Sequence, residues 1–567
     1  MPSTTVDTVL RYHNGTKHSF HQFARSLGYL DWASQPRPFR SYIGSPVIAL
    51  EPRRPPPRAT TGQSGERTVT YDDLFVPARI PPVQISAGTI GEMLRCSLGL
   101  SAWKVFGRSR WALRVNPSSG NLHPTEAYIV TGPLPELSPE SSVWHYAPES
   151  HSIEQRCAFE HRAWRHGGRD DGTETFLVVL TSIHWRESWK YGERAFRYCQ
   201  HDLGHAIGAV SLAAAMCGWE VAVRPRPRAW IAGVIGIDRD EDYVDAERED
   251  VGCLMLVSAS PAASWPDPDG DLADAARRGR WFGRASQLSE HHVQWTFIDE
   301  VADATRGAGE DDDRFTGTRA NPSAALPVAW HDRNAGPVAW HDRNAGVALD
   351  ARRLILQRRS AVALDGLSSI DRSGFLQMIT RLLPSSGAPW NALWWTPRIH
   401  LAIFVHRVTG LDPGLYVLVR DGASCPRLRT AFDPLFEWNA VEEGLPLYRL
   451  ALGGFRSRSQ RLSCDQAIAA DGFFSLAMVA DFDRSLTERG SSFYRNLFWE
   501  AGVIGQVLYL EAEAAGARGT GIGCYYDDAV HETLGLRDHT FQSLYHFAVG
   551  MPVEDRRLTT EPGYWWG

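Results

Sequence analysis

The sequence has 567 residues, of which 43% are hydrophobic and 22% are charged, and its formal net charge is -7. This length exceeds the roughly 100 to 200 residues usual for one domain, so we expect two large units that each bury a core. The composition excludes a disordered chain and a membrane protein, and no long Lys/Arg block provides the positive surface of a nucleic-acid-binding protein. Without a basic leader ahead of an apolar core, or any stretch of about 18 apolar residues, we predict a cytoplasmic protein with no membrane or nucleic-acid partner.

The cysteines are scattered over the whole length and form no C-x-x-C pair. They are Cys96, Cys157, Cys199, Cys217, Cys253, Cys425, Cys464 and Cys524. This distribution is typical of reduced, mostly buried thiols, so the sequence predicts neither a zinc cluster nor a disulfide framework.

A repeated pattern first occurs with an apolar strand, FLVVLTSI, that starts at Phe176. A polar connection follows, and then a long helix with a buried apolar stripe at Leu203, Ile207, Val210, Ala214 and Cys217. Gly218 stands where a left-handed residue commonly ends a helix. The apolar run GCLMLVSAS from Gly252 predicts a closing strand, so this copy mixes helices and strands.

The same pattern returns 298 positions later without a gap. A strand starts at Phe474, the following helix carries an apolar stripe and ends at Gly516, and YHFAVGMPV from Tyr545 predicts the last strand. The identical pairs are Phe176 and Phe474, Arg186 and Arg484, Gly192 and Gly490, Arg197 and Arg495, Gly204 and Gly502, Leu212 and Leu510, and Gly218 and Gly516. The chain is therefore predicted to hold two diverged copies of one α+β unit.

Two further pairs extend the repeat at other offsets. PSSG occurs at Pro117–Gly120 and at Pro384–Gly387, and Thr16–Ser19 has chemistry similar to Gln357–Ser360. The segment between the two motifs is much longer in the first copy. This difference predicts an insertion at about residues 30–90, which includes the Pro-rich stretch EPRRPPPR.

These boundaries assign residues 1–261 to the first copy and residues 347–567 to the second. Residues 262–346 are rich in Asp, Gly, Ala and Arg, so we expect a solvated, partly low-complexity linker there. The linker contains PVAWHDRNAG twice in succession, at Pro327–Gly336 and Pro337–Gly346. This tandem ten-residue duplication is too short for a solenoid, and we interpret it as a tolerated loop duplication.

Three short motifs could line one ligand. LILQRRSAVALDG, from Leu354, offers two guanidinium groups and a hydroxyl that could hold a phosphate, although adjacent arginines also occur on solvated faces. RVNPSSGNLHP, from Arg114, sets two hydroxyls and Asn121 in a turn between prolines. In GARGTGIGCYY, from Gly516, alternate glycines allow the backbone to pass close to the edge of a flat ligand.

The order of these motifs in the second copy resembles the FMN-dependent nitroreductases, in which RRS near the start is followed by PSS-G-N, a long helix with a glycine-rich loop and a terminal basic pair. RYH..TKHS with LDW after it, and SRWALRVNPSSGNLHPTEAYIV, resemble the SagB/ThcOx-type dehydrogenase branch, some members of which are fused pairs. The resemblance covers most of both copies and excludes the linker. It implies an α+β fold of two fused nitroreductase-like units that form an intramolecular pseudo-dimer.

The resemblance also implies one FMN at the interface between the units. In the family, one subunit supplies the RxS and glycine-loop elements and the other supplies the PSS turn. The residues that it assigns to cofactor binding are Arg358, Arg359, Ser360, Gly521, Gly523 and Arg556 from the second copy, with Arg557 as a further phosphate charge, and Pro117, Ser118, Ser119 and Asn121 from the first. It assigns no catalytic acid or base.

A mirror site would join Lys17, His18 and Ser19 to Pro384, Ser385 and Ser386. Its loop after the first helix reads WEVAVRPRPR and lacks the glycines, and its PSSG is followed by Ala-Pro instead of Asn-Leu. We therefore expect one FMN per chain.

A competing metal interpretation rests on HDLGH, because His201 and His205 share one helix face as in zinc proteases. That signature uses Glu where this chain has Asp, and the second copy forms its helix with Trp499 and Val503 at the histidine positions. We expect no metal site, and a packing or substrate-facing role for the histidines. No G-x-S-x-G elbow, Walker loop or dinucleotide-binding glycine motif supports another class of enzyme.

The sequence thus predicts an FMN-dependent oxidoreductase in which hydride enters at flavin N5 from NAD(P)H or an organic donor and leaves to a second substrate or oxygen. The substrate stays open between nitroaromatic compounds or quinones, implied by the broad family, and a peptide-derived azoline ring, implied by the SagB-like features. The alternatives are a flavin-free scaffold that binds a peptide or protein partner, suggested by the degenerate first-copy loop, and a zinc hydrolase built on HDLGH.

Overall fold

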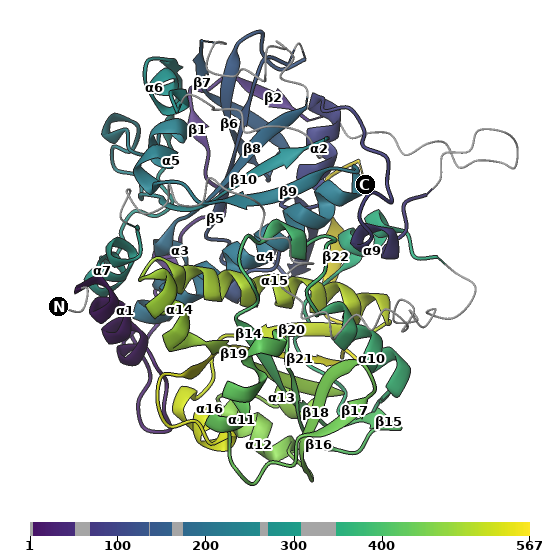
Figure 1. Cartoon of the computed structure of the whole chain (residues 1–567). Coiled ribbons are helices and arrows are strands. Elements are labelled where there is room, and N and C mark those ends of the chain that lie inside the picture. Colours follow the sequence, from purple (N-terminus) through teal and green to yellow (C-terminus); the bar gives the residue numbers. More distant parts are fainter. Residues whose placement is uncertain are drawn as a thin grey trace, which may run out of the picture.

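Two antiparallel sheets lie above and below a layer that contains two long helices, α4 (Ala195–Met216) and α15 (Phe493–Ala514) (Figure 1). The computed structural model describes residues 4–50, 68–134, 136–160, 174–260, 270–307 and 348–566. Within this part of the chain, no helix combines the length and apolar composition that a membrane crossing requires.

The first sheet is built from the first copy. Its strand order is β11 (Arg280–Trp281), β7 (Ser152–Phe159), β6 (Ser141–Ala147), β5 (Thr125–Thr131), β8 (Thr175–Ser182), β10 (Asp250–Ser258) and β9 (Glu220–Arg224), with β2 (Val47–Ala49) beside β7. One face packs on α4, and the other packs on α5 (Arg228–Ile235) and α6 (Leu272–Arg277). Because both faces are covered, β8 reads as a continuous apolar run.

The second sheet has the same arrangement. Its order is β17 (Asn439–Glu442), β18 (Leu445–Leu452), β16 (Gly414–Leu418), β14 (Ile399–Val405), β19 (Phe474–Asp481), β21 (Phe541–Gly550) and β20 (Arg518–Ile522). One face packs on α15. The other packs on α11 (Cys425–Ala431), α12 (Arg456–Leu462) and α16 (Asp527–Leu534).

Three pairs of elements have bounds that differ by 298 positions. Helix α3 (His184–Tyr191) corresponds to α14 (Phe482–Arg489), α4 to α15, and β9 to β20. Gly218 and Gly516 follow the long helices with φ values of +70° and +72°, as their predicted C-cap positions require. The predicted mixture of helices and strands is confirmed, in two units of like topology within one chain.

The two long helices are buried nearly all round, whereas the sequence predicted one apolar stripe on each. Each helix packs on its own sheet and on the other helix. A helix that packs on several sides must be small or apolar over most of its surface. The same layer includes α2 (Ala87–Arg95) beside α4, and α10 (Arg372–Arg381) beside α15.

The closest approach of α4 and α15 is at Gly204 and Gly502, which are equivalent positions of the repeat. A Cβ on Gly204 would lie 2.3 Å from the Trp499 carbonyl oxygen, and one on Gly502 would lie 2.3 Å from the His201 carbonyl oxygen. The backbones therefore touch, and only glycine fits on either side.

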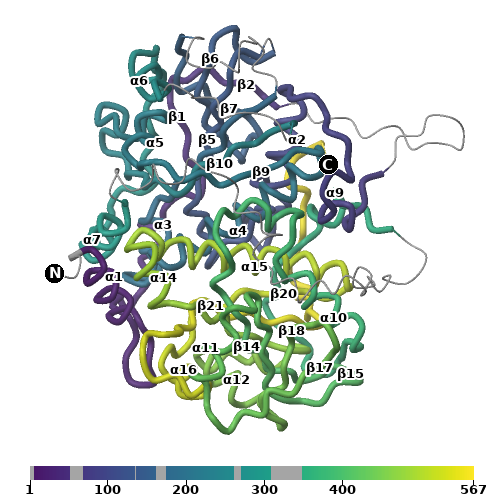
Figure 2. The backbone as a smooth tube through the Cα atoms, in the orientation of Figure 1, coloured from purple at the N-terminus to yellow at the C-terminus, as the bar shows by residue number. Residues whose placement is uncertain are grey.

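Each unit also extends chain segments onto the other, as the tube drawing in Figure 2 shows for α1 (Thr4–Gly15) and α9 (Ala351–Gln357). The α1 residue His13 hydrogen-bonds Gln542 of the second sheet at 3.1 Å. The C-terminal strand β22 (Thr559–Pro562) pairs with the hairpin β3 (Leu100–Phe106) and β4 (Ser109–Arg114) of the first unit.

The expectation of a solvated connector over residues 262–346 is wrong for residues 270–307, the part of this segment that the structure describes. Helix α6 and strand β11 complete the first unit, β12 (Arg284–Ala285) pairs with β1 (Tyr42–Ile43), and α7 (Thr296–Ala304) packs beside α1. Single buried apolar residues such as Leu272 and Val301 pack these elements against the rest of the protein. Many of their sequence neighbours are charged, so the average composition of the segment did not reveal the elements. The tandem duplication and the Pro-rich stretch lie outside the described residues.

Helix α7 is the structural equivalent of α1. Arg197 of α4 donates to Thr16 Oγ1 at 3.0 Å and to the His13 carbonyl oxygen. Its repeat mate Arg495 of α15 donates to Thr305 Oγ1 at 2.7 Å and to the Ala302 carbonyl oxygen at 2.9 Å. Thr16 therefore matches Thr305, and the expected match of Thr16–Ser19 with Gln357–Ser360 is wrong.

Gly204→Ala should force the central helices apart. Because the new Cβ would meet the backbone of α15, which cannot turn away, we expect a loss of about 3 kcal/mol or more in the free energy of unfolding. Urea or thermal denaturation measures this loss.

Gly208→Ala, one turn later in α4, is the matched control. Its Cβ would lie 3.0 Å from Gln506 Cβ and 3.1 Å from Gln506 Cγ, and a shift of a few tenths of an ångström between the helices relieves these contacts. We expect a change below about 1 kcal/mol, since alanine also favours the helix. Equal losses in the two variants would contradict the role given to the crossing.

Candidate functional site

A cavity of about 840 Å³ lies between the two units. Its lining includes these residues that the family resemblance assigned to cofactor binding: Arg358, Arg359, Ser360, Pro117, Ser118, Ser119, Asn121, Gly521, Gly523 and Arg556. The first unit contributes the turn after β4, part of the β3–β4 hairpin and one face of α4. The second contributes the segment after α9, strand β20 and the chain that leads to β22.

Arg358 is held across the boundary between the units. Its side chain donates to the carbonyl oxygens of Arg114 and Val115 at 3.0 and 3.1 Å, and its guanidinium lies 4.9 Å from the Tyr509 ring centre. The residue is only 3% exposed, and its Nε has no partner in the described part of the chain. Burial lowers the pKa of Arg358, so this buried cation would gain from an anionic ligand.

Arg359 belongs to a group of cations at one end of the cavity, with Lys104 and Arg518. Burial, with the charges of Arg358 and Arg518, lowers the pKa of Arg359 to about 10. The pKa of Lys104 is lowered by burial and also by Arg359 and Arg518. Arg518 is paired with Glu554. A gathering of like charges of this kind is an environment suited to phosphate.

Tyr509 of α15 joins two of the predicted motifs. Ser360 Oγ donates to the Tyr509 hydroxyl at 3.1 Å, and the Gly521 N–H donates to the same oxygen at 2.9 Å. One hydroxyl therefore fixes the RRS segment relative to the glycine-rich strand.

Asp202 of α4 holds the PSS turn by hydrogen bonds. The N–H and Oγ of Ser119 both donate to Asp202 Oδ1 at 3.1 Å, while Ser118 Oγ accepts from the His123 N–H at 2.8 Å. Gly120 has a φ of +60°, and a Cβ there would lie 2.6 Å from the Tyr191 hydroxyl. Asn121 lines the cavity, but its amide donates to the Ala112 carbonyl oxygen at 2.9 Å, which gives it a structural role in the turn.

Gly521 and Gly523 make room for aromatic rings as well as for a ligand. A Cβ on Gly521 would lie 1.9 Å from the Tyr545 hydroxyl, and one on Gly523 would lie 2.2 Å from the Tyr198 ring. Both tyrosines line the cavity. The alternate glycines therefore let the strand lie against the rings that form the cavity wall.

The two terminal arginines differ. Arg556 lines the cavity, whereas the Arg557 side chain donates twice to Asp555, at 2.9 and 2.8 Å, and Arg557 is not among the lining residues. The expectation of a phosphate contact is thus restricted to Arg556.

Several lining residues escaped the motif search, among them Tyr191, Tyr198 and Asp202. A usable signal was present in the repeat, because two of these positions differ in character between the copies. Arg489 stands at the place of Tyr191 and Asn496 at the place of Tyr198. Repeat positions that carry different residue types in the two copies therefore indicate where the two cavities differ.

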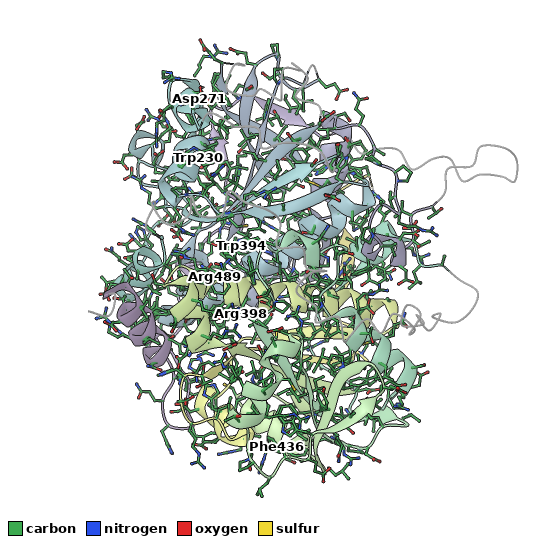
Figure 3. The ribbon with its side chains drawn as sticks, in the orientation of Figure 1. Trp230, Asp271, Trp394, Arg398, Phe436 and Arg489 are labelled. Atoms are coloured by element: carbon green, nitrogen blue, oxygen red, sulfur yellow. The ribbon has the colours of Figure 1, made fainter. Side chains whose placement is uncertain are left out.

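A second cavity, of about 830 Å³, lies at the position related to the first by the repeat. Val223 and Pro225 line it where Gly521 and Gly523 line the other, and Pro225 has no N–H to offer. Trp394 and Arg489, labelled in Figure 3, also line it, between the two units. The second cavity is similar in volume to the first, but among the described residues no glycine-rich strand lines it.

The expected mirror set is not brought together. Lys17 forms an ion pair with Asp528 at 2.8 Å, and His18 accepts a hydrogen bond from the Ala24 N–H at 2.9 Å. None of Lys17, His18, Ser19, Pro384, Ser385 and Ser386 lines the second cavity. The mirror set was wrong because it matched Thr16–Ser19 with the RRS segment. Thr16–Ser19 follows α1, which packs on the second unit, and does not line the second cavity.

The histidines of HDLGH pack against Tyr545. The His201 ring stacks on the Tyr545 ring with centroids 4.1 Å apart, and His205 Nε2 lies 3.1 Å from the Tyr545 hydroxyl. Burial lowers the pKa of both histidines. Among the described residues there is no group of three or more His, Cys, Asp or Glu side chains that could hold a metal ion.

Comparison with known proteins identifies the fold. Residues 417–551 match the model of the Nitroreductase family. An Anabaena variabilis protein assigned as a nitroreductase aligns with a TM-score of 0.66 and 20% identity over 96% of this chain and 99% of its own. The chain therefore has a nitroreductase-like fold, with two such units.

Partial alignments involve two further solved structures. An assigned nitroreductase from Ralstonia eutropha covers 41% of this chain and 90% of its own, with 17% identity and a TM-score of 0.26. The E. coli microcin synthetase McbBCD complex with truncated pro-MccB17 bound covers 43% and 86%, with 16% identity and a TM-score of 0.27. No curated protein matches the sequence significantly.

Asp202→Asn should change how stability depends on pH. Burial raises the pKa of Asp202 to about 7, and hydrogen bonds from Ser118 and Ser119 oppose this rise only in part. The folded state thus binds a proton that the unfolded state, with a carboxyl pKa of about 3.9, releases earlier. Wild-type stability must therefore fall as pH rises from about 4 to 7.

The asparagine variant keeps an oxygen for the Ser119 N–H and does not titrate. We expect its melting temperature, measured relative to wild type at pH 5, 6.5 and 8, to improve steadily with pH. The comparison is made in a Glu187→Gln background, because burial and then the charge of Asp202 raise the pKa of Glu187. A difference that is constant across this range would show that Asp202 does not titrate there.

Proposed function

We propose that this chain is an FMN-dependent oxidoreductase that holds one FMN in the cavity of about 840 Å³ between its units. The observation that carries the proposal is the buried guanidinium of Arg358, whose Nε lacks a partner in the described residues, beside a serine turn from the other unit. The match of residues 417–551 to the Nitroreductase family supports the same class of protein.

The residues present fit a flavin mononucleotide. Lys104, Arg359, Arg518 and Arg556 would hold the phosphate, because they place several cations at one end of the cavity. The Ser118–Ser119 turn and the strand around Gly521 would face the ring system from opposite units. When bound, FMN supplies hydride transfer at its N5 atom.

The protein's own groups would orient the reactants, exclude water and supply protons. Burial raises the pKa of Tyr191 and Tyr198, so both hydroxyls remain protonated at neutral pH and can donate hydrogen bonds to a substrate. The nearby Arg358 favours negative charge on the ring system, as oriented cations do in electrostatic catalysis.

We propose hydride transfer to or from a small organic or peptide-derived substrate, with NAD(P)H as a possible electron donor. The SagB-like sequence features favour dehydrogenation of a peptide-derived ring, while the broader family favours nitroaromatic or quinone reduction. We propose a single FMN because Val223 and Pro225 replace the glycines at the second cavity.

The first test is the visible absorption spectrum of the purified protein, followed by heat release and mass identification of any chromophore. About one FMN per chain would support the proposal. A colourless protein that also fails to take up added FMN would favour a flavin-free scaffold for a peptide or protein partner.

Arg358→Ala should weaken FMN binding before it changes chemistry. Loss of a hydrogen-bonded charge costs about 1.5–3 kcal/mol, so we expect FMN affinity to fall roughly 10- to 100-fold, measured by flavin fluorescence titration. Arg557→Ala is the matched control, because its guanidinium is paired with Asp555 outside the cavity. Unchanged affinity in Arg358→Ala would refute the assignment of this site.

A further inference from the structure

Two cysteines meet at the rim of the cavity. The Sγ atoms of Cys464 and Cys524 are 2.7 Å apart, although the residues are 60 positions apart in sequence. Both are half-buried free thiols. Cys524 directly follows Gly523 and lines the cavity, while Cys464 lies in the loop after α12.

The main chain fixes this meeting. The Tyr526 N–H donates to the Leu462 carbonyl oxygen at 2.8 Å, and Gln466 Nε2 donates to the Cys524 carbonyl oxygen at 3.1 Å. Cys464 also has a φ of +54°, a conformation that non-glycine residues rarely adopt. The two loops are therefore held together by contacts that do not involve the sulfur atoms.

Neighbouring groups favour a thiolate on Cys524. His18 Nδ1 accepts from the Ala24 N–H at 2.9 Å, which leaves its Nε2 as the donor. The adjacent Cys464 thiol is the main cause that lowers the pKa of Cys524 to about 5, and hydrogen bonding from His18 and the charge of Arg194 add to it. A cysteine of this kind is ionised at neutral pH and nucleophilic.

We propose that Cys464 and Cys524 form a redox-active dithiol that closes reversibly to a disulfide by exchange with small-molecule disulfides. In the first step, the Cys524 thiolate attacks one sulfur of a disulfide RSSR, forms a mixed disulfide and releases RS⁻. In the second, Cys464, after losing its proton, attacks the Cys524 sulfur and displaces the second RS⁻. The net change oxidises two protein thiols and reduces RSSR to two RSH.

The pair would give the chain a two-electron centre beside the cavity. Its sulfur chemistry does not depend on a bound flavin. In a reducing compartment such a disulfide would be transient, as in redox-sensing proteins.

The test uses the full-length protein with its flavin removed or present. The protein is equilibrated with mixtures of reduced and oxidised glutathione, quenched with acid, alkylated with N-ethylmaleimide in denaturant, digested and analysed by mass spectrometry. We expect a peptide that links Cys464 to Cys524, two fewer alkylated thiols per chain, and full reversal by dithiothreitol. Eight alkylated thiols at every ratio of reduced to oxidised glutathione would overturn the proposal.

Single variants test the attacking role of Cys524 and the resolving role of Cys464 separately. Cys464→Ser should accumulate glutathione on Cys524, because the resolving thiol is gone, and Cys524→Ser should form neither the adduct nor the link. Cys425→Ser, at another half-buried cysteine, should form the link as wild type does. A glutathione adduct on Cys524 of wild type that never proceeds to the link would count against Cys464 as its partner.

Reactivity gives a second readout. At pH 6.5, Cys524 should react with iodoacetamide at least tenfold faster than Cys425, because its neighbours favour the Cys524 thiolate. Because these readouts are independent of flavin content, their failure and the failure of the proposed oxidoreductase function can be told apart.

Discussion

The contact of α4 and α15 at Gly204 and Gly502 is the constraint on which the rest of the molecule depends. With no Cβ on either side, the two backbones touch, and the units cannot slide past each other without a clash. Both helices line the cavity, with Tyr198 and Asp202 from α4 and Tyr509 from α15. The crossing therefore fixes how these side chains from the two units lie relative to one another.

Placing both copies in one chain allows the two interface cavities to differ. In a homodimer, both cavities carry the same residues by symmetry. Here Gly521 faces one cavity while its repeat mate Val223 faces the other. One cavity has kept the glycine-rich edge, and the other has kept its volume of about 830 Å³ without it.

A buried ion pair connects the rim of the first cavity to the N-terminal segment. Asp527 accepts from Arg194, which precedes α4, and Arg197 of α4, each at 2.9 Å, and from the backbone N–H of His18. These cations hold the pKa of Asp527 well below its usual range. The pair anchors the segment that begins at Gly523, so Cys524 and the cavity wall share one rigid support.

By itself, the sequence determined the two α+β units, the equivalence of α4 with α15, the left-handed ends at Gly218 and Gly516, and the three motifs that contribute part of the lining of the first cavity. These features depend on local periodicity, on glycine conformation and on motifs that recur in order, all of which are properties of short segments. The tertiary structure alone decided that α7 replaces the expected linker, that α1 packs on the second unit and that Asp202 anchors the PSS turn. It also placed Cys464 beside Cys524. Such pairings join residues far apart in the chain, and they depend on which faces the two central helices bury against each other, which no local pattern records.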